Sequence, residues 1–301
     1  MADEKKTRSG SAEIARRHVW FAVFLVGTCA VFHKALATLV SYSLHDDSSS
    51  HIVLIPWIAI FLVYWDRRRI FVSTTTGFRS GSGLVLGGVL LDLLSRRIPL
   101  LQEGNWLLSL SICSIVLIWL GGFVVCYGLA SLRAAAFPLC FLLLMVPLPD
   151  VILDRAIRAL QEGSADMAYL IFKLVGTPVW RNGLLLSVPG VTIEVAKECS
   201  SIRSSIALVI TCLLAAQLYL RTAWKVLLLV VVSLLLSVVK NGIRIATLTL
   251  LSIYVDPAFL FGRLHREGGF AFFALALLLI WPVFTLLERS DRLQRISNST
   301  S

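Results

Sequence analysis

Long apolar runs alternate along the chain with short polar segments that are mostly basic. A membrane-spanning helix needs roughly 20 mostly apolar residues. The pattern therefore predicts an all-α membrane protein with about eight transmembrane helices, and seven or nine are alternatives because several runs are short or contain glycine. The expected spans lie near residues 19–40, 52–65, 83–94, 106–126, 134–148, 204–220, 226–250 and 268–287.

The longest segment between these runs, residues 149–203, carries two further patterns. From Val151 to Val175, apolar residues recur at helical spacing among charged ones, which predicts an amphipathic helix on the outer membrane surface. Residues 179–195 contain two turn sequences with β-branched residues between them, which predicts a small β-hairpin before the sixth span.

This organisation predicts one polytopic transmembrane domain over residues 18–288. The flanking tails, residues 1–17 and 289–301, are rich in charge and serine and are expected to be disordered. A cleavable signal peptide is the competing interpretation of the N-terminus. Against it, the run from Val19 to Val40 is long enough to span a membrane and has no clear cleavage site of small residues.

Basic residues between the runs predict the orientation, because Lys and Arg accumulate in the short cytoplasmic loops of membrane proteins. A cytoplasmic N-terminus and a cytoplasmic C-terminus fit this rule best, although Arg96 and Arg97 then lie outside. The basic residues placed inside are Lys5, Lys6, Arg8, Arg16, Arg17, Arg67, Arg68, Arg69, Arg79, Arg133, Arg221, Lys225, Arg289, Arg292 and Arg295.

Composition supports the membrane class. Hydrophobic residues make up 57% of the chain and charged residues 15%, with a mean hydropathy of +0.82, whereas a soluble domain is about 45–50% apolar and about 25% charged. The net charge of +10 is spread over short clusters between apolar runs, as topology signals are. This distribution argues against nucleic acid as a partner.

Of the six cysteines, only Cys199 has a polar neighbourhood, and the other five lie in apolar runs where cysteine acts as a small hydrophobe. A helix N-terminus lowers the pKa of a thiol from its usual value of about 8.5 and so favours the nucleophilic thiolate. Ser200 and Ser201 suit such a helix start. A structural membrane cysteine is the alternative interpretation.

Arg244 lies late in the seventh apolar run. An arginine at membrane depth costs roughly 2.5–3.5 kcal/mol and normally faces a protein interior or a wet cavity. It shares a helical face with Asn241, three residues earlier, and it could bind a carboxylate or stabilise a developing oxyanion. The alternatives are a snorkelling side chain at a helix end, or an ion pair with Glu194, Glu198 or Asp256.

His265 precedes the eighth span and could act beside a thiol as general acid or base, because its pKa lies near neutrality. An interfacial histidine without a special role is the alternative. With a cytoplasmic N-terminus, the alternation of spans places Cys199, Arg244 and His265 in the same outer leaflet. No metal-ligand spacing is evident among the His and Cys residues, and no cofactor is expected.

At these residues the chain resembles the exosortase/archaeosortase family of multi-spanning membrane transpeptidases, and the similarity runs from about Tyr42 to about Leu287. The short motifs are weak singly, and their order and spacing make the resemblance fairly specific. The matching pieces are residues 194–204 around Cys199, the sequence Asn241-Gly242-Ile243-Arg244-Ile245, His265 with a glycine pair after it, residues 145–149 before Leu160-Gln161, and His51 with Pro56.

The resemblance implies a cysteine peptidase or transpeptidase of the bacterial exosortase type. Such enzymes cleave exported proteins at a C-terminal signal, which consists of a Pro-Glu-Pro-type motif, a transmembrane helix and a basic tail. They act through a thioester and pass the product to an acceptor. The family implies a catalytic set of Cys199, Arg244 and His265, supported by Asn241, Arg203, Ser200 and Ser201.

His265 favours the bacterial type, because archaeal relatives have an arginine at that position. Ser201 departs from the usual family glycine, which permits close backbone approach, so it bears on substrate fit beside the thiol. The resemblance further implies the bacterial inner membrane, an active site on the periplasmic face, and exported proteins and membrane lipids as partners. The acceptor and the oligomeric state stay open.

Two other classes of function remain open. A non-enzymatic component of exopolysaccharide assembly or export, with Arg244 lining a polar path, would explain the intramembrane charge but leaves Cys199 without a role. A plain membrane scaffold would account for the composition alone.

Overall fold

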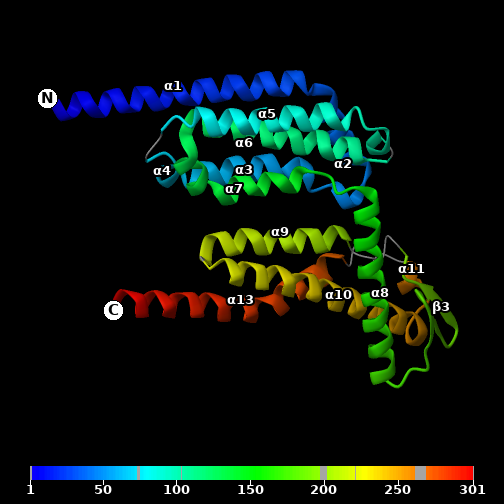
Figure 1. The fold of residues 1–301 in the computed structure, drawn as a ribbon. Coiled ribbons are helices and arrows are strands. Elements are labelled where there is room, and N and C mark those ends of the chain that lie inside the picture. The colour runs from blue at the N-terminus through cyan, green and yellow to red at the C-terminus, as the bar shows by residue number, and fades with distance from the viewer. Residues whose placement is uncertain are drawn as a thin grey trace. The chain divides into compact units, whose positions relative to one another are not determined.

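A computed structural model describes the backbone of residues 2–72, 75–102, 104–196, 202–220, 222–261 and 269–300. These residues form helices and one small antiparallel sheet (Figure 1). The chain divides into two compact units, Met1–Ile152 and Leu153–Ser301. The single transmembrane domain over residues 18–288 stays a prediction.

The regular elements among the described residues of the first unit are all helices. Helix α6 is the most buried of its long helices, and α5 and α1 both pack closely on it. Helices α5 and α6 approach each other through glycines, and a Cβ atom on Gly121 would lie 2.7 Å from the backbone oxygen of Gly81. Helix α1 packs on α6 where Phe24 covers Gly122. The elements are α1 (Ala2–Val31), α2 (His33–His45), η1 (Asp47–Ser49), η2 (Ile52–Leu54), α3 (Ile55–Trp65), α4 (Arg67–Ile70), α5 (Phe78–Ser95), η3 (Pro99–Gln102), α6 (Trp106–Ala134), α7 (Ala136–Phe141) and η4 (Leu142–Met145).

The apolar runs of this unit form helices whose bounds differ in part from the expected spans. The run predicted as one span at 19–40 is interrupted at Phe32, whose φ of −96° and ψ of 20° separate α1 from α2. Helix α1 begins at Ala2 and so includes residues for which the sequence predicts a tail. The run at 52–65 is one apolar helix, Ile52–Trp65, which is shorter than a typical span. The run at 134–148 is interrupted at Ala135, and its helical part ends at Met145, before the extended Val146.

The second unit contains a helical bundle and the sheet. Its elements are α8 (Asp150–Leu174), which begins just before the boundary, β1 (Trp180–Asn182), β2 (Leu185–Val188), β3 (Val191–Glu194), α9 (Ile202–Tyr219), α10 (Ala223–Tyr254), α11 (Ala258–Phe261) and α13 (Gly269–Thr300). Helix α8 matches the amphipathic helix predicted from Val151 to Val175, and its apolar face is buried at Leu153, Ile157, Ala165, Ala168 and Phe172.

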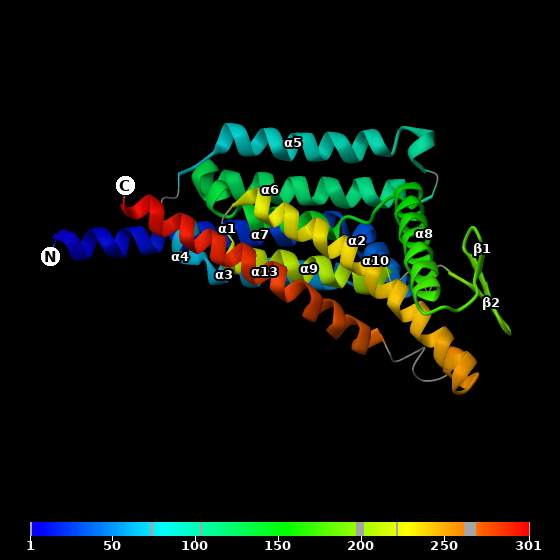
Figure 2. The same ribbon diagram turned by 90° about the horizontal axis from the view of Figure 1, so that it is seen from below.

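Helices α9, α10 and α13 lie side by side (Figures 1 and 2). Their shared core consists of Leu208, Cys212, Ala216, Leu220, Leu229, Ala276, Ile280 and Leu287. Helix α9 begins, α10 ends and α13 begins at the same end of this bundle, where α8 crosses α10 and the sheet packs beside them. A second core joins α8, the sheet and α10 through Phe172, Leu186, Val195 and Ala246.

The predicted hairpin is a three-stranded meander with the order β1-β2-β3. Both turns expected from the sequence are present. Because there are two turns, they connect three strands, whereas a hairpin has two strands and one turn. Gly183 and Gly190 occupy them with φ values of 61° and 81°, a backbone conformation that glycine adopts without steric penalty. The pairing runs from Trp180 opposite Ser187 to Val188 opposite Val191.

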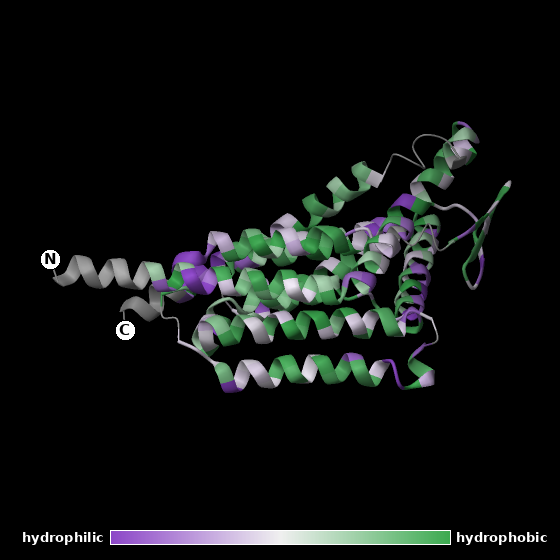
Figure 3. Ribbon diagram, turned by 90° about the horizontal axis from the view of Figure 1, so that it is seen from above, coloured by the Kyte–Doolittle hydropathy of each residue, from purple (hydrophilic) through white to green (hydrophobic). Residues whose placement is uncertain are grey.

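Within the described residues, six helices are long and apolar enough to cross a membrane, or up to seven if α7 with η4 and α8 count as one broken span. The sequence predicted about eight, a number that the structure does not confirm. Figure 3 shows apolar residues along the long helices. The six are Ala12–Val31, Phe78–Ser95, Trp106–Ala134, Ile202–Tyr219, Ala223–Tyr254 and Gly269–Gln294.

A buried ion pair joins the first turn of α10 to α13. The Lys225 ammonium donates to Asp291 Oδ1 at 2.6 Å, and the two residues are 0% and 3% exposed. Thr222 donates to the same carboxylate, and Lys225 also donates to Ser290 and Gln294. This network buries Asp291 inside α13, within the segment 289–301 for which the sequence predicts a tail.

Candidate active site

The candidate site begins with a polar stripe on α10. Polar residues recur there at intervals of three or four, with Lys240 and Asn241 as an adjacent pair, so these side chains gather on one side of the helix. Lys240 and Asn241 are 2% and 1% exposed, and Arg244 is partly buried. Ser233 and Ser237, which are also buried, continue the stripe toward the start of the helix and donate to carbonyls of their own helix. A stripe this polar inside an apolar helix faces protein rather than lipid.

Helix α8 covers part of this stripe. The side-chain amide of Asn241 donates to Ser164 Oγ at 3.0 Å, and Ser164 donates back to its own helix at Leu160. The crossing is close because Gly242 has no side chain. A Cβ atom there would lie 2.5 Å from Cβ and Cγ of Met167. The glycine therefore lets α8 approach α10 closely enough for Asn241 to hydrogen-bond to Ser164.

The chain that leaves the sheet is tied to the same turn of α8. Gln161 Nε2 donates to the carbonyl oxygen of Val195 at 2.7 Å, and the Val195 N–H donates to Leu184. Val195 is itself buried in the core that α8 shares with the sheet. The backbone is thus fixed just before residues 197–201.

The chain that enters α9 is tied to α10. Lys240 Nζ donates to Ser204 Oγ, two residues after α9 begins at Ile202. Lys240 and Arg244 are four residues apart on one helical face and repel each other electrostatically. Lys240 and Arg244 therefore place two cationic side chains on one partly buried helical face, and such groups can stabilise a carboxylate or a developing oxyanion.

Three of the predicted site residues fall within the described part of the chain. Arg244 and Asn241 lie on the α10 stripe, and Arg203 is exposed in the first turn of α9. Cys199, Ser200, Ser201 and His265 lie outside the described residues. The starts of α9 and α13, which follow Cys199 and His265 in sequence, lie at the end of the bundle where α10 ends (Figure 1). Convergence of the three catalytic residues stays a prediction.

The polar contacts that organise this region were not evident in the sequence. Ser164, Ser204 and Lys240 were not among the predicted site residues, although each contacts a predicted residue or flanks one. One signal was available, because Gln161 and Ser164 are spaced three residues apart among the apolar positions of α8.

The described residues define a multi-pass membrane protein whose buried polar cluster lies where α8 crosses α10, beside the start of α9. A family model described as transmembrane exosortase (Exosortase_EpsH) matches residues 42–282, and the chain belongs to this family. Membership indicates a membrane protein with a sorting transpeptidase role. Comparison with curated proteins and with solved structures finds no match.

Proposed function

We propose that the protein is a membrane cysteine transpeptidase that cleaves exported proteins at a C-terminal sorting signal, with Cys199 as nucleophile. One observation carries the proposal. Hydrogen bonds hold one flank of residues 197–201 to α8, through Gln161 at Val195, and the other flank to the polar stripe of α10, through Lys240 at Ser204. Cys199 is four residues from Val195 and five from Ser204. Because an extended chain spans at most about 3.6 Å per residue, the Cα atom of Cys199 can lie at most roughly 14 Å from that of Val195 and roughly 18 Å from that of Ser204.

The chemistry follows from these residue types. The Cys199 thiolate attacks the carbonyl carbon of the substrate peptide bond, and Arg244 stabilises the negative charge on the carbonyl oxygen. When the C–N bond breaks, His265 gives a proton to the leaving amine and the substrate stays bound as a thioester. An acceptor nucleophile then gives its proton to His265, attacks the thioester and releases the thiolate.

The proposed substrates are exported proteins that end in a Pro-Glu-Pro-type motif, a transmembrane helix and a basic tail. The proposed location is the bacterial inner membrane, with the site open to the periplasmic face. A membrane-embedded substrate helix suits an enzyme that itself spans the membrane several times. Lys240 and Arg244 would then lie near the segment of the substrate that adjoins its transmembrane helix.

The test is processing of a candidate substrate co-expressed with Cys199→Ala. We expect no new substrate C-terminus by mass spectrometry, while the variant still inserts into the membrane. Cys140→Ala is the matched control, because Cys140 is an exposed thiol in the first unit and should leave processing unchanged. Normal processing by Cys199→Ala would refute the thioester mechanism, and a Cys199 that resists thiol reagents would favour a non-enzymatic role in exopolysaccharide assembly.

Arg244→Lys tests the second catalytic role. Lysine keeps the charge but not the planar fork of donors, so we expect the processing rate to fall at least about tenfold, which is about 1.4 kcal/mol of transition-state stabilisation. Arg158→Lys, an exposed arginine on α8, is the control and should be silent. Full activity in Arg244→Lys would show that only the charge matters.

A further inference from the structure

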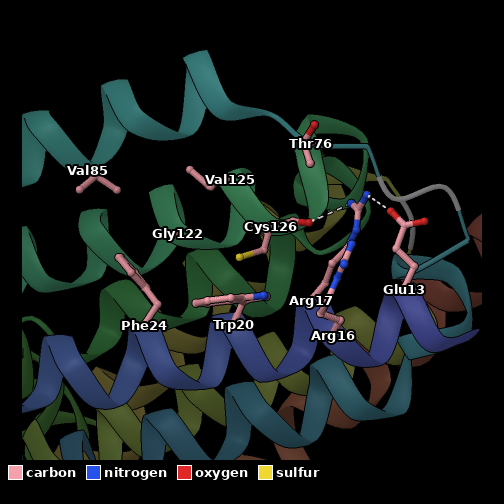
Figure 4. A pocket seen from close by; sticks show the side chains of 10 residues that line it. All are labelled: Glu13, Arg16, Arg17, Trp20, Phe24, Thr76, Val85, Gly122, Val125 and Cys126. Atoms are coloured by element: carbon pink, nitrogen blue, oxygen red, sulfur yellow. Dashed lines mark hydrogen bonds and ion pairs between the residues drawn. The ribbon is translucent and has the colours of Figure 1, made fainter.

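The first unit contains a cavity that the proposed catalytic site does not use. Its volume is about 480 Å³, and α1, α5, α6 and the residues just before α5 enclose it (Figure 4). Helix α1 precedes the segment that matches the exosortase family, so the cavity lies partly outside that segment. The lining residues are Glu13, Arg16, Arg17, Trp20, Phe24, Thr76, Val85, Gly122, Val125 and Cys126.

The cavity is charged at one end and apolar at the other. Figure 4 shows Glu13, Arg16 and Arg17 at one end, and Val85 and Phe24 at the opposite end. Arg16 and Phe24 are eight residues apart on α1, which is about 12 Å along the helix axis. This polarity matches an amphiphile that has a charged head and an apolar chain.

The charged end is positive. Arg17 forms an ion pair with Glu13 at 2.8 Å and donates to the backbone carbonyl of Cys126 at 3.0 Å. Glu13 therefore balances the charge of Arg17, and the exposed guanidinium of Arg16 gives this end its net positive charge. Trp20, half-way along the cavity, has the amphipathic ring that is enriched at membrane interfaces.

The walls of the cavity are held by close packing. A Cβ atom on Gly122 would lie 2.2 Å from the Phe24 ring, so α1 rests directly on α6. On α1 next to Arg17, His18 hydrogen-bonds to the Tyr127 hydroxyl at 2.7 Å, and its ring packs edge-on against Phe71. These contacts fix α1 on both sides of Trp20, so the cavity belongs to the packed fold.

We propose that this cavity binds one anionic phospholipid, with its phosphate at Arg16 and Arg17 and an acyl chain along Phe24, Val85 and Val125. Basic pockets between membrane helices attract acidic lipids, above all on the cytoplasmic side, where such lipids accumulate. The predicted orientation places the N-terminus on that side. The proposal does not depend on the transpeptidase function, because Cys199, Arg244 and His265 all belong to the second unit.

The test compares phosphatidylglycerol with phosphatidylcholine added to the full-length protein in detergent. We expect phosphatidylglycerol to stay bound in native mass spectrometry and to raise the melting temperature, because a ligand that binds only the folded state stabilises it. Phosphatidylcholine at the same concentration should do neither. Arg16→Gln should weaken phosphatidylglycerol binding about tenfold, or about 1.4 kcal/mol, while Arg68→Gln, an exposed arginine of α4, should leave it unchanged.

Cys126 offers a readout inside the cavity that needs no substitution. Bound phosphatidylglycerol should slow alkylation of Cys126 several-fold, whereas the exposed Cys140 should react at an unchanged rate. Inorganic phosphate and the headgroup without acyl chains should not protect. Equal protection by phosphatidylcholine, protection by phosphate alone, or unchanged lipid binding in Arg16→Gln would each overturn the proposal.

Discussion

At the residue scale, Lys240 is the side chain whose role the structure defines most sharply. Its ammonium is buried and donates to Ser204, near the start of α9. We expect Lys240→Met to lower substrate processing about tenfold, since the start of α9 then loses its link to α10. Stability should stay equal or rise, because a buried charge is replaced by an apolar side chain of similar size.

The two measurements for Lys240→Met are processing rate and melting temperature in detergent. Lys34→Met, an exposed lysine of α2, is the matched control and should change neither. A variant that processes substrate normally would show that the contact with Ser204 has no influence on catalysis. A variant that fails to fold would show that Lys240 is structural.

The pair of Lys225 and Asp291 permits a second prediction at this scale. Both groups are buried, so Lys225→Met breaks the buried ion pair and should cost about 3–5 kcal/mol of stability. The double variant Lys225→Met/Asp291→Leu should recover most of that loss, because it removes both buried charges. Thermal unfolding of the two single variants and the double variant measures the coupling energy between Lys225 and Asp291. If the losses of the single variants simply add up in the double variant, the two residues are not coupled and the prediction is wrong.

At the scale of elements, the crossing of α8 over α10 depends on one missing side chain. Leucine at position 242 would place its Cβ against Met167 near the backbone of Ala168, so α8 must move away. We expect Gly242→Leu to lower stability by about 1–3 kcal/mol, as overpacking does, and to reduce processing because Asn241 loses Ser164. Gly87→Leu is the control, since nothing lies near a Cβ at that glycine of α5. Equal melting temperatures for the two variants would show that α8 can move away from α10 without loss of stability.

The elements also show how far the sequence could predict this fold. The amphipathic helix at 151–175 and both turns of the sheet were predictable, because helical spacing and turn residues are local signals. The breaks at Phe32 and Ala135 were not, because hydropathy measures how apolar a run is and not where its backbone bends.

In the candidate site, too, local features were predictable from the sequence and long-range contacts were not. The place of Arg244 on a long apolar helix and the face it shares with Asn241 followed from the spacing of polar residues in an apolar run. The partners of Asn241 on α8 and of Lys240 on α9 did not, because the contacts Asn241 to Ser164 and Lys240 to Ser204 join residues 77 and 36 positions apart. Such contacts depend on how the helices cross, and one sequence gives little sign of that.

At the scale of the whole molecule, the orientation in the membrane determines which face the proposed chemistry serves. The rule of cytoplasmic basic residues predicts that both termini lie inside and that residues 149–203 lie outside. The structure adds that Lys225 is buried against Asp291, so it contributes less surface charge than the sequence suggested. The exposed Arg67, Arg68 and Arg69 of α4 still support the same orientation.

Labelling of introduced cysteines in intact cells tests this orientation. Thr192→Cys, at an exposed position of β3, should react with a membrane-impermeant maleimide added outside. Arg68→Cys, at an exposed position of α4, should react only after the membrane is opened, because a charged reagent cannot cross the apolar core. The background should be a variant in which the native cysteines are replaced, so that each signal comes from one thiol. The reverse pattern would place Arg244 and the start of α9 at the cytoplasmic face, where an exported substrate could not reach them after translocation. Exported proteins could then not be the substrates, even if Cys199 proved to be a reactive nucleophile.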